Sequence, residues 1–177
     1  MHLFNKLNPM VLFVLIGLMS FKSAPFFHSI VSSESKICFS SKNASGTFDA
    51  IKGTIEFDEK NLVKSSFDLV INVASIHTGK KMQDKHAKGK DWFDAESYPE
   101  IIFRSIEVKK VMDGFEAVGG IEIKGIKKEI NIPFKWSGNS FIGSFDVNRI
   151  DFAVGSLKGM QKHVDEIIHV DFVIKTQ

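Results

Sequence analysis

Apolar side chains recur at every second position over most of the chain after residue 35, and this period of two restricts the fold more than any other feature. The segments 51–57, 67–73 and 141–147 show it clearly, with mostly polar residues or glycine between the large apolar ones. Strict alternation over roughly four to eight residues is typical of a β-strand with one buried face. Turn-forming pairs such as Asp113-Gly114 separate the segments. The pattern predicts an all-β antiparallel protein.

Seven or eight such strands, each with one apolar face, must form either a two-layer sandwich or a closed barrel. Gly53 and Gly143 interrupt two of the strand patterns, which is typical of the sharp bends at barrel corners. We therefore expect a barrel. About eight strands enclose an interior that is either filled by side chains or holds one ligand, and periodicity alone does not separate these two cases.

One charged stretch, from Ser75 to Pro99, lacks the alternation. We expect a short helical insertion around residues 79–97, with Asp91 as the N-cap of a second helix ahead of Trp92. Pro99 ends this insertion, and the strand pattern then resumes at Ile101 and Phe103.

Composition excludes several classes of protein. Cys38 is the only cysteine among the 177 residues, so an internal disulfide framework and a multi-cysteine metal site are excluded. Residues 1–24 hold two of the 23 basic side chains and none of the 21 acidic ones, which leaves residues 25–177 neutral. A nucleic-acid-binding protein normally has a basic excess. The 17 phenylalanines favour a dry apolar interior.

The segment 1–24 has the pattern of a secretory signal peptide. Lys6 precedes an apolar run from Met10 to Met19, and small residues follow. The run is shorter than the ~20 residues that a spanning helix needs. Cleavage after Ser20, Ser23 or Ala24 stays open, and the alternatives to export are a retained anchor or a core helix. We expect a periplasmic or secreted protein.

Residues able to carry chemistry form no recognisable catalytic set. Asp84 and His86 stand two apart in the expected helix and point in different directions, so we expect hydrogen bonds to the barrel rather than a metal site. No serine hydrolase motif and no phosphate-binding loop occurs in the sequence. The lysines from Lys80 to Lys90 form either a solvated helix face or a cationic rim that meets an anionic head group. We expect no catalytic residue, metal or cofactor.

Several motifs follow one another in an order that resembles a known family. They are Gly46-Thr47-Phe48, then Gly53-Thr54-Ile55-Glu56-Phe57-Asp58, then Asp84-x-His86 followed by Asp91-Trp92-Phe93-Asp94 and Tyr98-Pro99, and finally Arg149-x-Asp151-Phe152. Together they resemble the YceI-like family of exported, lipocalin-like proteins that bind polyisoprenoids. Ala153 departs from the family pattern, in which glycine is common after the last motif.

The resemblance implies that residues 25–177 form a single domain, an eight-stranded antiparallel lipocalin-like barrel around an elongated apolar tunnel. It implies a long isoprenoid or other polyprenyl or acyl chain as the ligand, held for transport or storage, with no cofactor. Two alternatives stay open: an enzyme that acts on such lipids, and a filled barrel that works as a protein-interaction module. A homodimer and a transient membrane contact also stay open as partners.

The expected tunnel residues are the inward-facing apolar positions of the strands. They are Ile37, Phe39, Ile55, Phe57, Phe67, Leu69, Ile71, Phe103, Ile121, Ile123, Ile132, Phe134, Phe145 and Phe172. The expected contacts to a ligand head group are Lys85, His86 and Lys88.

Overall fold

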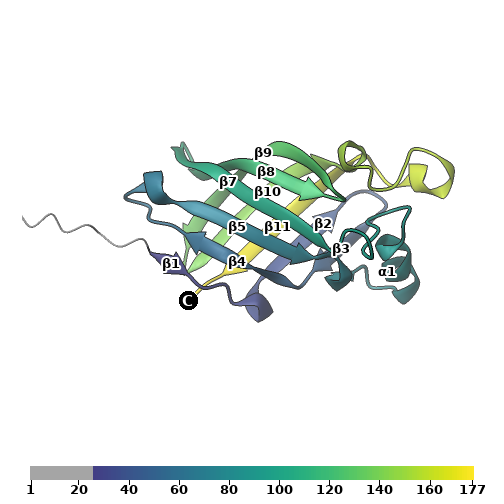
Figure 1. Ribbon diagram of the computed structural model, residues 1–177, viewed down its shortest axis with the longest axis horizontal. Helices are drawn as coiled ribbons and strands as arrows, with labels where there is room; N and C mark the ends of the chain where they lie inside the picture. Colours follow the sequence, from purple (N-terminus) through teal and green to yellow (C-terminus); the bar gives the residue numbers. More distant parts are fainter. Residues whose placement is uncertain (1–25) are drawn as a thin grey trace, which may run out of the picture.

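The computed structural model describes residues 26–177 as one antiparallel sheet with a single α-helix (Figure 1). The expected signal peptide lies outside the described residues. The strands are β1 (Phe27–His28), β2 (Lys36–Ser40), β3 (Ser45–Phe48), β4 (Ile51–Glu56), β5 (Ser66–Asn72), β6 (Ile76–His77), β7 (Glu100–Val111), β8 (Gly114–Ile123), β9 (Ile126–Ser137), β10 (Ser140–Asn148) and β11 (Ile167–Lys175). The all-β antiparallel prediction is confirmed.

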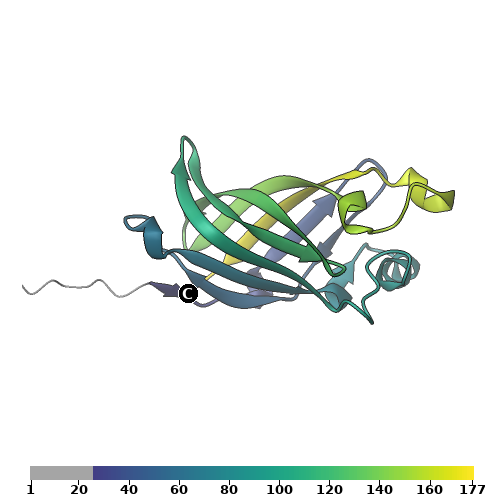
Figure 2. The ribbon, with the colours of Figure 1, turned by 45° about the horizontal axis from the view of Figure 1, so that its top comes forward.

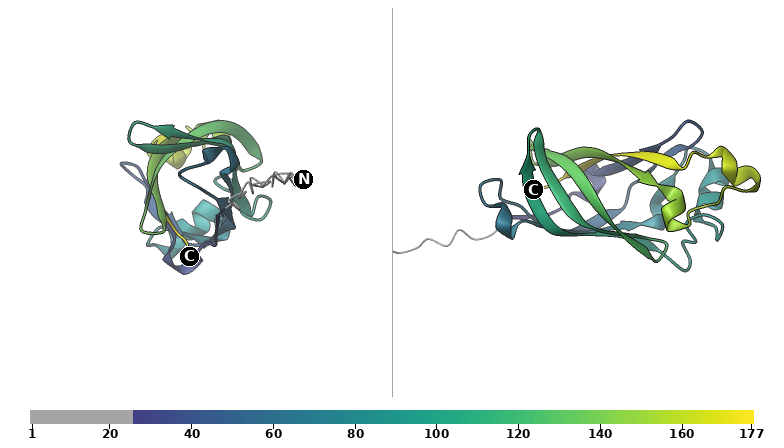
Figure 3. Two further views of the ribbon diagram at one scale, coloured as in Figure 1. Left: turned by 90° about the vertical axis from the view of Figure 1, so that its left-hand side faces the viewer. Right: turned by 90° about the horizontal axis from the view of Figure 1, so that it is seen from above.

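The sheet is curled around a central axis, as the end-on view shows (Figure 3). Its strand order is β1-β4-β5-β7-β8-β9-β10-β11-β2-β3-β6. Only two residues separate β3, near one end of this order, from β4, near the other end. Because the chain runs directly from one end of the order to the other, the curled sheet meets itself, which gives the barrel shape seen in Figure 2.

The prediction of eight strands is wrong, because the sheet contains eleven. Two long extended segments are each divided into two strands. Asp49-Ala50 separates β3 from β4, and the 3-10 turn Val73–Ser75 separates β5 from β6. In that turn the Asn72 side chain accepts a hydrogen bond from the Ala74 amide, which takes this part of the chain out of the sheet. The two-residue strand β1, paired with β4, adds a further strand.

The helical insertion is shorter than expected. It consists of α1 (Lys81–Lys88), and the next residue, Gly89, has an extended backbone that stops the helix. The predicted second helix with Asp91 as its N-cap is absent from the described chain, since residues 90–97 form turns. Backbone bonds from Asp94 to Gly89 and from Ala95 to Lys88 fold these turns back on the end of α1. The short 3-10 helices lie at Ser32–Glu34, Leu62–Lys64, Val73–Ser75, Arg149–Phe152 and Gly159–His163.

Two glycines, Gly53 and Gly143, allow backbone segments to approach closely within the sheet. Gly53 on β4 has a φ of 142°, and a Cβ there would overlap the carbonyl oxygen of Asp68 on β5. At Gly143 a Cβ would overlap the carbonyl of Pro133 and press on the Phe172 ring. Both positions therefore require glycine.

We expect Gly53→Ala to lower the free energy of unfolding by about 2–4 kcal/mol, because it adds a steric overlap to an unfavourable φ. Gly79→Ala is the matched control, since Gly79 has a φ of 81° and open space around its Cα. That control should cost only about 1 kcal/mol, the backbone term alone. Urea unfolding measures both, and equal losses would contradict the overlap at Gly53.

Candidate functional site

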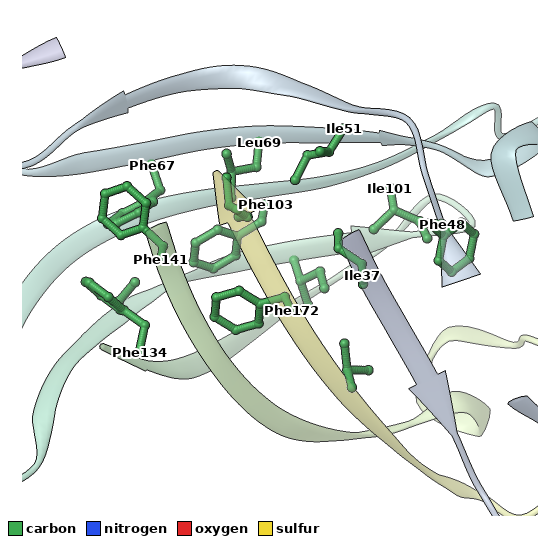
Figure 4. Close-up of a cluster of buried hydrophobic side chains, with 14 of the residues drawn as sticks. Ile37, Phe48, Ile51, Phe67, Leu69, Ile101, Phe103, Phe134, Phe141 and Phe172 are labelled. Atoms are coloured by element: carbon green, nitrogen blue, oxygen red, sulfur yellow. The ribbon is translucent and has the colours of Figure 1, made fainter. Parts of the chain in front are cut away.

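The barrel interior contains a cavity of about 410 Å³ lined mainly by apolar side chains. This volume lies in the range of roughly 300–1,000 Å³ that is common for ligand sites. The side chains in Figure 4 come from strands far apart in the sequence and gather in the same interior. The lining consists of Ile37, Phe39, Asn43, Ala44, Ser45, Phe48, Ile51, Phe67, Leu69, Ile71, Ile76, Thr78, Gln83, His86, Ala87, Trp92, Phe93, Ile101, Phe103, Ala117, Ile121, Ile123, Ile132, Phe134, Phe141, Phe145, Val147, Arg149, Phe152, Val154, Met160, Gln161, Val164, Ile168, Val170, Phe172 and Ile174.

The expected tunnel residues line this cavity with two exceptions, Ile55 and Phe57. Both are almost fully buried, but they lie in the packed end of the barrel rather than along the open interior. Alternation predicted correctly that they face inward. Alternation does not indicate which part of the barrel is filled by side chains. Ile55 and Phe57 therefore lie outside the cavity that they were expected to line.

A cluster of aromatic rings fills this end of the barrel. The Phe57 ring packs edge-on against Phe115 at 5.1 Å and against Phe141 at 5.3 Å, measured between ring centroids. His28 on β1 covers the cluster, 4.7 Å from the Trp136 ring and 5.6 Å from the Phe141 ring. Edge-to-face pairs of this kind stabilise a packed core beyond the area that they bury. The cavity is therefore closed here, with Phe141 on its floor.

The opposite end, here called the mouth, is formed by three segments between strands: residues 41–44, residues 78–98 and residues 149–166. Hydrogen bonds join the first to the third. The Lys42 amide donates to Asp165 Oδ2 at 2.7 Å, and Asn43 Nδ2 donates to the His163 carbonyl at 2.8 Å. Figure 2 shows α1 and residues 149–166 at the same end of the barrel.

Arg149 organises the third segment from inside. Its side chain is buried and donates to backbone carbonyls on both sides of the loop, including Val154 at 2.8 Å and Val164 at 2.8 Å. Further bonds reach Gln161 and Asp165. Burial lowers the pKa of the guanidinium, while the negative charges of Glu166 and Asp165 oppose that shift. One cation thus holds the loop and places positive charge beside the cavity.

Two contacts connect the second and third segments. The guanidinium of Arg149 lies over the Trp92 ring, 5.4 Å from its centroid, in a cation–π arrangement. Lys124 reaches in from the turn between β8 and β9, where its Nζ donates to the Lys90 carbonyl at 3.0 Å and to the Ala153 carbonyl at 2.9 Å. The mouth is therefore a connected rim rather than three independent loops.

Of the expected head-group contacts, only His86 lines the cavity. Lys85 and Lys88 lie on α1 outside the lining, and their contact with a head group stays a prediction. An eight-residue helix directs only part of its surface toward the cavity, and Gln83, His86 and Ala87 occupy that part. The other polar side chains of the lining were not predicted from the sequence; they are Asn43, Ser45, Thr78, Gln83, Arg149 and Gln161. Their placement depends on tertiary contacts, and no periodic signal marks them.

Asp84 ties α1 to the barrel, as expected from the sequence. Its carboxylate accepts hydrogen bonds from the Thr78 hydroxyl at 2.6 Å and from the Thr78 amide at 2.7 Å, and it lies 3.3 Å from His77 Nδ1. These bonds, led by the one from the Thr78 hydroxyl, lower the pKa of Asp84. Asp84 is therefore engaged on the barrel side of the helix.

Within residues 26–177, no three His, Cys, Asp or Glu side chains gather as a metal-binding cluster. In the same part of the chain, no helix is both long and apolar enough to cross a bilayer.

A curled antiparallel sheet with an apolar cavity, closed at one end and rimmed by polar groups at the other, defines a small barrel protein of the lipocalin-like class. The YceI-like domain model matches residues 28–176, and the chain belongs to that family. The family predicted from the sequence motifs is therefore confirmed.

The chain is 33% identical over 93 residues to a UPF0312 protein of Yersinia pestis, and it has the same identity over the same length to one of Yersinia enterocolitica. The match covers 52% of this chain and 48% of those relatives, about half their length.

Solved structures show the same fold. BcnA of Burkholderia cenocepacia superposes with a TM-score of 0.76 at 27% identity, over 82% of this chain and 98% of that one. The Campylobacter jejuni YCEI protein superposes with a TM-score of 0.64 at 18% identity, over 97% and 99%. A polyisoprenoid binding domain from Saccharophagus degradans has a TM-score of 0.57 at 16% identity, over 85% and 97%.

We expect Arg149→Met to loosen the mouth, because it leaves several buried carbonyls without their donor. Amide hydrogen exchange in residues 153–166 should rise, and the free energy of unfolding should fall by about 2–4 kcal/mol. Arg104→Met is the matched control, since Arg104 forms only a half-exposed pair with Asp68. Its effect should stay within about 0.5 kcal/mol. Unchanged exchange in residues 153–166 of Arg149→Met would contradict the assigned role.

Proposed function

We propose that this protein binds a long isoprenoid or other polyprenyl or acyl chain in its interior and serves as a carrier or store for it. The apolar cavity open at the mouth carries the proposal. Among the described residues that line it, none is Asp, Glu or Lys, and phenylalanine and isoleucine predominate. Such a lining offers a flexible hydrocarbon chain contact along its length and offers little to a polar solute.

The energetics support the same ligand class. Each methylene moved from water into an apolar site contributes about 0.8 kcal/mol, so a long chain has a large driving force for entry. A relative of the same fold, from Saccharophagus degradans, is described as a polyisoprenoid binding domain, and membership of the YceI-like family supports extending that ligand class to this chain.

The polar groups at the mouth set the position of the head group in this proposal. Thr78, Gln83 and His86 come from residues 78–98, and Arg149 and Gln161 come from residues 149–166. These side chains suit a head group that accepts hydrogen bonds, such as a quinone, an alcohol or a phosphate. We further propose that binding involves no chemical turnover, and that the protein acts after export to the periplasm or the outside of the cell.

Native mass spectrometry of the protein from its exported fraction, followed by organic extraction of the same sample, tests this function. We expect a discrete mass adduct that the solvent releases as a prenyl or acyl lipid. A bare protein mass after exposure to membrane lipids would overturn the proposal and favour a surface-interaction role.

Filling the cavity should displace the ligand without disturbing the outer surface. Ala117 on β8 is buried and lines the cavity, so Ala117→Phe places a ring where the chain would lie. Excluding two or more methylenes at about 0.8 kcal/mol each should lower affinity by about tenfold or more. The matched control is Ile142→Phe, because Ile142 is exposed on β10. Equal lipid content in the two folded variants, measured by extraction, would argue against this site.

A further inference from the structure

We propose that the mouth is a docking surface for an anionic lipid membrane, so that cargo passes between the bilayer and the cavity without crossing water. The surface consists of two segments that border the mouth, residues 80–90 with α1 and residues 156–164 with the last 3-10 helix. Both lie at the same end of the barrel in Figures 1 and 2. The docking proposal rests on the proposed function in one respect, namely that the cargo is a water-insoluble chain.

Large apolar side chains point into solvent from both segments. Met160 is 83% exposed and yet also lines the cavity, so it spans the interior and the outer surface. Leu157 is 51% exposed in the same segment, and Met82 on α1 is 65% exposed. Side chains of this kind enter the boundary between head groups and acyl chains when a protein lies on a bilayer.

Lysines accompany these apolar side chains. Residues 80–90 contain five lysines and one acid, Asp84, which is engaged with Thr78 on the barrel side. Residues 156–164 contain Lys158 and Lys162 and no acid. None of these lysines forms an ion pair within the described part of the chain, while acidic residues lie just beyond the two segments, at Asp91 and at Asp165 and Glu166. Lysines near an anionic leaflet are attracted by its negative surface potential.

The other end of the barrel lacks a route to the cavity. It also exposes apolar side chains, because Met112 in the β7–β8 turn is 104% exposed and Val63 in the β4–β5 connection is 95% exposed. The aromatic cluster around Phe57 and Phe141 closes the interior beneath that end. Apolar exposure, unpaired lysines and an opening to the cavity therefore coincide only at the mouth, which favours a lipid surface as its partner.

The test attaches an environment-sensitive fluorophore at one cysteine in the full chain, with Cys38 replaced by serine. Leu157→Cys reports on the mouth without altering the cavity lining, and Met112→Cys is the matched control at the closed end. Vesicles of phosphatidylcholine with phosphatidylglycerol carry spin-labelled lipids as quenchers. We expect quenching at position 157 and none at position 112, with loss at high salt or on phosphatidylcholine alone.

In the Leu157→Cys background, the further change Lys158→Glu with Lys162→Glu should weaken vesicle binding by about tenfold or more. Equal quenching at both positions, quenching at position 112 alone, or no quenching at either would overturn the docking proposal. A stable protein partner at the mouth without vesicle contact would also overturn it. Lipid extraction from the same samples reports on the cargo separately, so docking and cargo binding succeed or fail independently.

Discussion

The antiparallel pairing of β2 with β11 joins the N-terminal and C-terminal parts of the sheet, and the interior depends on it. In its register Ile37 faces Phe172 and Phe39 faces Val170, so apolar positions of both strands align on the inner side. A slip by one residue would turn the apolar side chains of β2 outward. The pairing therefore turns the apolar faces of the N-terminal and C-terminal strands toward one interior, and the direct connection from β3 to β4 brings the two ends of the curled sheet together.

This interior is unequally filled along its length, because aromatic rings interlock at one end. Phe57, Phe115, Phe134 and Phe141 converge there with Trp136. Elsewhere the cavity is lined by both aliphatic side chains and rings, such as Ile121 and Phe48. The same apolar chemistry therefore provides both the packed core and the cavity.

The mouth has a different physical basis, because hydrogen bonds add to the apolar side chains that it buries, such as Phe152 and Val154. Arg149 donates to carbonyls that would otherwise lose their partners on burial. Lys124 and the stacking of Arg149 on Trp92 extend the connection to the turns after α1. Polar groups at the rim are thus fixed by backbone bonds and stay beside an otherwise apolar cavity.

The sequence by itself determined the class of fold and the inward face of the strands, because alternation is a local property that each strand carries alone. It also indicated the family, through motifs such as Asp91-Trp92-Phe93-Asp94, and it predicted that Asp84 bonds to the barrel. Of the fourteen expected tunnel residues, twelve line the cavity, including Phe103 and Phe172.

Only the tertiary structure decided the rest. Whether an inward-facing residue belongs to the packed end, as Ile55 and Phe57 do, depends on its position along the barrel axis. The breaks between strands depend on local hydrogen bonds such as that of Asn72. The place of Arg149 beneath its own loop and against Trp92, and of His86 rather than Lys85 at the cavity, follows from tertiary packing. Alternation indicates which side of a strand is buried, but it does not indicate which residues pack against that side.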